Sequence, residues 1–163
     1  MATVRRQIII NRTADDVYAV LGDPVTIADW FPGVLSATVD GNERVITTVS
    51  GLPMTEQIVT NDAIQRRFQY RLAPGFIHDH LGTIDVFDLG DRRSLVSYAT
   101  DCEPAALALM IGGATGNALK EVKRQLEGQE PRRPAEQGPT SQGETWPERP
   151  GAAGAKSGGK GQP

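Results

Sequence analysis

Two histidines separated by one residue, His78 and His80, are the only histidines in this chain of 163 residues. They fall in a stretch that reads as a long strand over 77–89, and residues two apart on a strand share a face. Because Ile84 and Val86 continue that face, we expect it to be the inner one. Histidine titrates near neutral pH, so the pair could orient a ligand, move a proton or form structural hydrogen bonds.

A metal site on this pair would need a third ligand, and Glu56 and Asp101 are the candidates. Zinc sites take at least three protein ligands. We therefore predict no metal and no cofactor. Cys102 is the single cysteine, which excludes a disulfide within the chain and a cysteine-based zinc site, and we expect it to be structural. The sequence contains no P-loop, nucleophile elbow or dinucleotide-binding glycine pattern.

Glu56 is a candidate for chemistry because it lies in a predicted strand over 55–60. A carboxylate that points into an apolar cavity is costly to bury unpaired, and its pKa rises. Such a group could bind a ligand hydroxyl or amine, directly or through water. In the alternative register Glu56 points to solvent, and Thr55 and Gln57 point inward.

Aromatic side chains supply further candidates. Tyr70 lies in a predicted strand over 66–72 that alternates apolar and polar residues, and Tyr98 lies in one over 94–100. Either tyrosine could present its hydroxyl inward or pack in the core. Trp30 and Phe31 could line a pocket, since aromatic surface dominates the contacts of apolar sites, or could equally pack a short helix against the sheet.

The elements that must position these side chains follow from periodicity and turn signals. Helices are predicted over Ala14–Leu21, with Thr13 as N-cap, and in a short segment between Pro24 and Pro32. Apolar spacing predicts a last helix from Glu103 to about Glu127. The predicted strands cover residues 4–10, 34–39, 44–49, 55–60, 66–72, 77–89 and 94–100.

Three glycines, Gly112, Gly113 and Gly116, fall inside the last predicted helix. Each costs about 1 kcal/mol relative to alanine in a helix interior. A kink, the close approach of another backbone or open space beside a ligand would explain them. Alternatively, the helix begins late, near Thr115, and the residues before it form a loop.

The order of elements predicts an α+β fold. Seven strands without βαβ units imply an antiparallel sheet, with two short helices between the first and second strands and one long helix at the end. One amphipathic helix cannot fill a strongly curved sheet of seven strands. We therefore expect an internal cavity.

This order and several local patterns resemble the START-like (SRPBCC) superfamily, including the polyketide cyclase/dehydrase and lipid-transport group and the major birch pollen allergen. The resemblance covers most of residues 4–127. It implies a helix-grip fold, a curved sheet wrapped on the C-terminal helix. The residues that carry it are Thr13-Ala14-Asp15-Asp16-Val17-Tyr18, Val20-Leu21-Gly22-Asp23, Ala28-Asp29-Trp30-Phe31-Pro32-Gly33-Val34, His80 with Thr83-Ile84, and Leu119 to Glu127.

A narrower likeness is to plant abscisic acid receptors of the same superfamily. Their gate loop reads Ser-Gly-Leu-Pro, as residues 50–53 do here, and a Thr-Glu pair follows, as Thr55 and Glu56 do. Residues 78–81 are only similar to their latch loop and lack its arginine. The likeness implies a pocket mouth covered by two loops, and it does not imply hormone sensing.

Composition divides the chain in two. Residues 1–127 are long enough for one core, whereas 14 of the 36 residues from Gly128 to Pro163 are glycine or proline. Such a stretch cannot bury enough apolar surface to fold, so we predict a disordered tail over 128–163. The net charge of −3 argues against a nucleic-acid surface. Because the apolar run Ile8-Ile9-Ile10 is too short for a signal peptide or a membrane span, a soluble cytoplasmic protein is expected.

We therefore predict a protein that binds a small hydrophobic molecule, such as a lipid, quinone or polyketide, for transport, sequestration or sensing. Two alternatives remain: a polyketide cyclase or dehydrase that uses His78, His80, Glu56 or Tyr70, and a protein-interaction module with a collapsed cavity. The predicted ligand-binding residues are Trp30, Phe31, Leu52, Pro53, Glu56, Tyr70, His78, His80, Ile84, Tyr98, Ile111 and Thr115.

Overall fold

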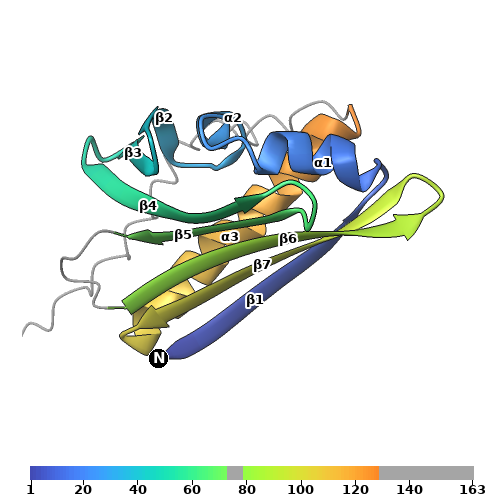
Figure 1. The fold of residues 1–163 in the computed structure, drawn as a ribbon. Helices are drawn as coiled ribbons and strands as arrows, with labels where there is room; N and C mark the ends of the chain where they lie inside the picture. The colour runs from blue at the N-terminus through green and yellow to red at the C-terminus, as the bar shows by residue number, and fades with distance from the viewer. Residues whose placement is uncertain (73–78, 129–163) are drawn as a thin grey trace, which may run out of the picture. The chain divides into compact units, whose positions relative to one another are not determined.

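The computed structural model describes residues 1–72 and 79–128 (Figure 1). Their helices and strands follow the predicted order. In chain order they are β1 (Ala2–Ile10), α1 (Ala14–Leu21), α2 (Ile27–Trp30), β2 (Val34–Asp40), β3 (Glu43–Thr48), β4 (Pro53–Asp62), β5 (Arg67–Leu72), β6 (Asp79–Gly90), β7 (Arg93–Glu103) and α3 (Ala105–Leu126).

The strands form one antiparallel sheet in the order β1-β7-β6-β5-β4-β3-β2. The sheet is a meander from β2 to β7, and β1 joins it beside the last strand. Ala2 lies opposite Cys102 and Ile10 opposite Ser94, so β1 and β7 pair along their whole length. The curved sheet packs on α3 mainly through β1 and β7 (Figure 1). The predicted α+β helix-grip fold is confirmed.

The first helix begins at its predicted cap. The Asp16 backbone N–H donates to Thr13 Oγ1 at 3.2 Å, which satisfies one of the unpaired donors of the first turn. The helix then buries Val17, Tyr18 and Leu21 against the sheet. These contacts belong to one continuous core, which also includes Trp30 of α2.

The last helix begins at Ala105, so the alternative start near Thr115 is wrong. Close approach explains one of its three glycines. A Cβ at Gly112 would overlap the side chain of Val4 on β1, whereas a Cβ at Gly113 would meet nothing within 4 Å. A Cβ at Gly116 would make only an ordinary contact with Arg6 at 3.5 Å. Gly112 therefore lets α3 approach β1 closely.

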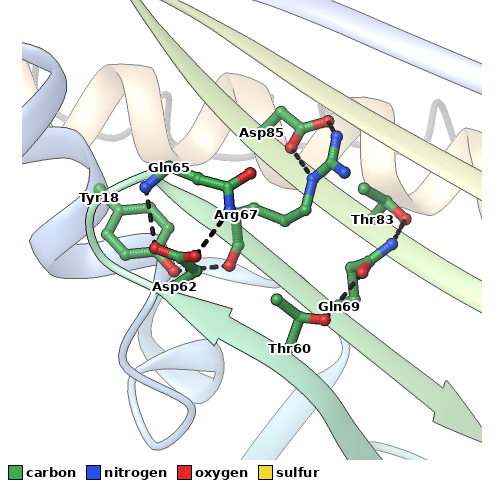
Figure 2. A network of polar contacts seen from close by, with 8 residues as sticks. All are labelled: Tyr18, Thr60, Asp62, Gln65, Arg67, Gln69, Thr83 and Asp85. Carbon is green, nitrogen blue, oxygen red and sulfur yellow. Dashed lines mark hydrogen bonds and ion pairs between the residues drawn. The ribbon is translucent and has the colours of Figure 1, made fainter.

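A row of polar contacts ties β4, β5 and β6 together on the face of the sheet that points away from α3 (Figure 2). Gln69 links the two neighbouring strands, accepting from Thr60 at 2.9 Å and donating to Thr83 at 3.1 Å. Beside it, Arg67 and Asp85 pair through two nitrogen–oxygen contacts of 2.6 and 3.0 Å. Because residues alternate along each strand, these contacts direct the intervening side chains toward the interior.

Some predictions fall on residues 73–78 and 129–163, which lie outside the described part of the chain. They include the role of His78 and the disorder of the tail after Gly128. Within the described ranges, no helix is long and apolar enough to cross a membrane.

Candidate functional site

A cavity of about 260 Å³ lies between the sheet and α3. Its walls come from α2 and the connection to β2, from β3, β4, β5 and β6, and from the first half of α3. Most of the lining is aliphatic or aromatic. The lining residues are Ile27, Phe31, Pro32, Gly33, Val34, Ile46, Thr48, Met54, Glu56, Tyr70, Leu72, His80, Met110, Ile111 and Ala114.

The predicted site residues divide into four groups. Phe31, Glu56, Tyr70, His80 and Ile111 line the cavity. The other predicted residues fall outside that lining. Four of them are buried in the interior but do not line the cavity: Trp30, Ile84, Tyr98 and Thr115. Two are exposed, Leu52 and Pro53, and His78 lies outside the described residues.

A buried ion pair stands at the polar end of the cavity. Arg44 and Glu56 lie directly opposite each other on β3 and β4, and Arg44 Nε is 2.6 Å from Glu56 Oε2. The two residues are 2% and 3% exposed. Glu56 lines the cavity, whereas Arg44 lies behind it and donates from Nη1 to the Pro24 carbonyl at 3.3 Å. The inward orientation of Glu56 follows from this pairing.

Aromatic rings surround the guanidinium of Arg44. Its Cζ atom lies 5.3 Å from the centre of the Phe68 ring and 5.0 Å from that of Tyr70. Cation–π contacts offset part of the cost of removing the charge from water. Burial raises the pKa of the Glu56 carboxyl, and the charge and hydrogen bond of Arg44 oppose that shift. The ion pair therefore favours a charged carboxylate inside an apolar interior.

Two tyrosine hydroxyls meet beside this carboxylate. Tyr70 Oη and Tyr98 Oη are 2.6 Å apart, and both side chains are buried. The ring of Tyr70 crosses β6 at Gly82, where a Cβ would overlap the ring atoms Cε1 and Cζ. Burial raises the pKa of both tyrosines well above the ordinary value, so their hydroxyls stay protonated.

His80 completes the polar end. Its ring centre lies 5.4 Å from that of Tyr70, and its Nδ1 accepts from the Leu72 backbone N–H at 3.3 Å. Burial lowers the pKa of His80 to about 4, and the charge of Asp101 opposes this shift only in part. His80 is therefore neutral at physiological pH. Leu72 also lies opposite Glu56 in the β4–β5 register, which places the histidine and the carboxylate on either side of β5.

A larger hollow of about 880 Å³ adjoins the same end of the sheet and shares Glu56, Leu72 and His80 with the cavity. Charged and polar residues such as Glu43, Arg71 and Asp101 form much of its remaining lining. Such walls do not suit an apolar molecule. The smaller cavity, with its apolar walls and few polar groups at one end, has the character of a small-molecule site.

Among the residues that the structure describes, this region offers no donor set for a metal. Within residues 1–72 and 79–128, no three histidine, cysteine, aspartate or glutamate side chains lie together as a metal site would require. Glu56 is paired with Arg44, and His80 Nδ1 is occupied by a backbone N–H.

Sequence reasoning missed Arg44, which proves central to the site. Its position two residues before Ile46 places both side chains on one face of β3, and Ile46 is buried. That spacing was the available signal. Lining residues from α3 and from the start of β2, such as Met110, Ala114 and Val34, were also missed.

The sequence matches the family described as polyketide cyclase/dehydrase and lipid transport over residues 1–128. A search of the curated proteins finds no relative. Solved structures share the fold at low identity. XoxI from Bacillus cereus is 20% identical with a TM-score of 0.72, over 78% of this chain and 96% of that one.

Two further structures carry names that state an activity. Norcoclaurine synthase from Thalictrum flavum, solved with dopamine and hydroxybenzaldehyde, is 15% identical with a TM-score of 0.64, over 80% of this chain and 89% of that one. The di-domain ARO/CYC protein BexL from the BE-7585A biosynthetic pathway is 17% identical with a TM-score of 0.65, over 78% of this chain and 47% of that one. At these identities the likeness shows the fold.

Proposed function

Because the chain belongs to the polyketide cyclase/dehydrase and lipid transport family, we propose that it binds a small, mostly apolar molecule in the cavity between the sheet and α3. Binding would serve transport, sequestration or sensing. The observation that carries this proposal is the distribution of polar groups. Apolar residues form most of the wall, and Glu56, Tyr70 and His80 gather at one end.

This distribution supports binding because the two parts of the wall do different work. Burial of apolar ligand surface supplies about 25 cal/mol for each Å² removed from water. The few polar groups fix the orientation of the ligand. A volume of about 260 Å³ lies just below the range of roughly 300–1,000 Å³ typical of drug-sized ligands, so the proposed ligand is small.

The second candidate is a cyclase or dehydrase that acts on a ligand in the same cavity. The presence of a carboxylate and protonated hydroxyls at one end favours it. Glu56 would accept a proton from the carbon next to a ligand carbonyl, while Tyr70 or His80 donates a hydrogen bond to the carbonyl oxygen. Arg44 already binds one oxygen of Glu56 and opposes the rise in the Glu56 pKa that burial causes, and for that reason we rank binding first.

Native mass spectrometry of the full chain, purified from its own cells, tests the binding proposal. We expect a fraction of the protein to carry one additional small, apolar molecule. Replacement of Ala114, which lines the cavity, by phenylalanine should remove that species. Asn117→Phe is the matched control, because Asn117 is exposed on the same helix and does not line the cavity.

An equal ligand-bound fraction in the wild type and the Ala114→Phe variant, or no bound molecule in either, would contradict the proposal. The released molecule also separates the two candidate functions. Recovery of the same molecule after incubation with fresh protein supports binding, whereas its conversion to a cyclised or dehydrated product supports catalysis.

A further inference from the structure

We propose that the cavity selects neutral ligands with a carbonyl oxygen, which accepts hydrogen bonds from Tyr70 and His80, and that Tyr98 acts through Tyr70 as a positioning residue. This inference rests on the proposed function and deepens it. It predicts that the cavity binds carbonyl compounds of the quinone or polyketide type more tightly than fatty-acid anions or plain hydrocarbons.

The direction of the tyrosine hydrogen bond follows from counting hydrogens. Two hydroxyls carry two hydrogens, and the 2.6 Å contact uses one of them. In the described part of the chain, Tyr98 Oη has no other partner, and the nearby buried Thr100 Oγ1 has none at all. If Tyr70 donated to Tyr98, the hydrogen of Tyr98 would be buried without an acceptor, which costs about 1–3 kcal/mol.

In the opposite direction the hydrogen without a partner among the described residues belongs to Tyr70, the one of the two tyrosines that lines the cavity. Tyr98 donates to Tyr70, and the hydrogen of Tyr70 is then free for an acceptor in the cavity, which Tyr70 lines. Because Tyr70 already accepts one hydrogen bond, its own O–H becomes a better donor, by about 10–30% in strength. The absence of a side chain at Gly82 leaves the space that the ring occupies.

His80 supplies the second donor. Its Nδ1 accepts from the Leu72 N–H, so the single proton of the neutral ring is on Nε2. The ring lies beside Tyr70, with 5.4 Å between ring centres, and both line the cavity. An sp² oxygen has two lone pairs and can accept from two such donors.

The carboxylate of Glu56 determines which ligand charge the cavity accepts. It lines the cavity, whereas the guanidinium that neutralises it lies behind it and does not. A ligand carboxylate at this end would therefore meet a carboxylate first, in a medium that screens charge poorly. A neutral carbonyl compound avoids that repulsion, and a ligand hydroxyl could also donate to Glu56.

Three probes that differ at one position test this assignment: 1-tetralone, tetralin and 1,2,3,4-tetrahydronaphthalene-1-carboxylate. Their dissociation constants are measured by calorimetry with the full chain. We expect tetralone to bind more tightly than the carboxylate. We also expect Tyr70→Phe to reduce the preference for tetralone over tetralin by about tenfold, the effect of losing one well-placed hydrogen bond. Tyr98→Phe should reduce it by a smaller factor.

Tyr18→Phe is the matched control. It removes a tyrosine hydroxyl that bonds to Asn61 and to the Arg67 carbonyl, away from the cavity lining. It should leave the preference for tetralone over tetralin unchanged.

The carbon-13 shift of the bound tetralone carbonyl gives a second readout, which the wild type alone can supply. It should lie downfield of its value in hydrocarbon solvent, and Tyr98→Phe should move it partly back.

The outcomes distinguish this inference from the proposed function. A carbonyl shift equal to that in hydrocarbon, or equal preferences in the wild type and Tyr70→Phe, overturns the inference alone. Tight binding of the carboxylate also overturns it. If no probe binds while a native apolar ligand is still found, the inference fails and the proposed function stands. If neither is found, both fail.

Discussion

Arg44 and Glu56 face each other across β3 and β4, joined at 2.6 Å and almost completely removed from solvent. The pair connects the fold to the cavity, because Glu56 lines the cavity and Arg44 is tied to the Pro24 carbonyl before α2. One nitrogen of the guanidinium, Nη2, has no partner among the described residues. A buried pair of this kind contributes orientation and polarity more than stability.

The first prediction concerns this pair. Arg44→Met or Glu56→Leu alone should lower the free energy of unfolding by about 3–5 kcal/mol, since each leaves an uncompensated buried charge. The double variant Arg44→Met/Glu56→Leu should recover most of that loss. Urea unfolding measures all three. Asp15→Asn, which breaks the exposed pair with Arg66, is the control and should cost below about 1 kcal/mol. If the double variant loses as much free energy of unfolding as the two single variants together, the pair is not coupled as described.

The second prediction compares two adjacent glycines of α3. Gly112→Ala should destabilise the protein by about 1–3 kcal/mol, because the new Cβ would overlap Val4 and force the helix from β1. Gly113→Ala should stabilise it by about 0.5–1 kcal/mol, because its Cβ meets open space and alanine favours the helix. Thermal unfolding measures both. Changes of the same sign would show that α3 does not pack on β1 as described.

The third prediction concerns pH. The pKa of His80 is lowered from 6.5 to about 4 in the folded protein, so the unfolded chain binds a proton over a range in which the native protein does not. Stability linked to His80 is therefore complete above pH 6.5 and is lost as the pH falls toward 4. The loss should reach about 2–3 kcal/mol.

Urea unfolding of the wild type and of His80→Gln, from neutral pH to pH 4, isolates this contribution. The wild type should lose more stability over that range than the variant does. Asp101, whose charge acts on His80, is present in both proteins. If the free energy of unfolding falls equally with pH in the wild type and in His80→Gln, His80 is not buried as a neutral ring.

Much of the fold was predictable because sheet periodicity is local. The alternation around Phe68 and Tyr70 predicted a strand over 66–72, and β5 runs over Arg67–Leu72. Strand ends were less predictable, because pairing extends them. β4 runs over Pro53–Asp62, whereas the local pattern predicted residues 55–60. Its extra residues are held by the register with β3 and β5, which no local pattern contains.

The site was less predictable, because it depends on contacts between segments distant in sequence. The likeness to a gate loop suggested that Leu52 and Pro53 cover the cavity. The connection between β3 and β4 is instead a tight turn, in which the Thr48 N–H donates to the Leu52 carbonyl at 3.2 Å. So short a turn leaves Leu52 65% exposed. The partner of Glu56 could not be named either, since only the register places Arg44 opposite it.

The most direct test of the central claim follows the isoleucine methyl groups of the full chain by NMR during a titration with 1-tetralone. Ile27, Ile46 and Ile111 line the cavity, whereas Ile9 and Ile64 are exposed on other parts of the protein. We predict saturable shifts of the first three signals and none of the last two. Binding of the probe that leaves the signals of Ile27, Ile46 and Ile111 unchanged would contradict the claim that this cavity is a ligand site.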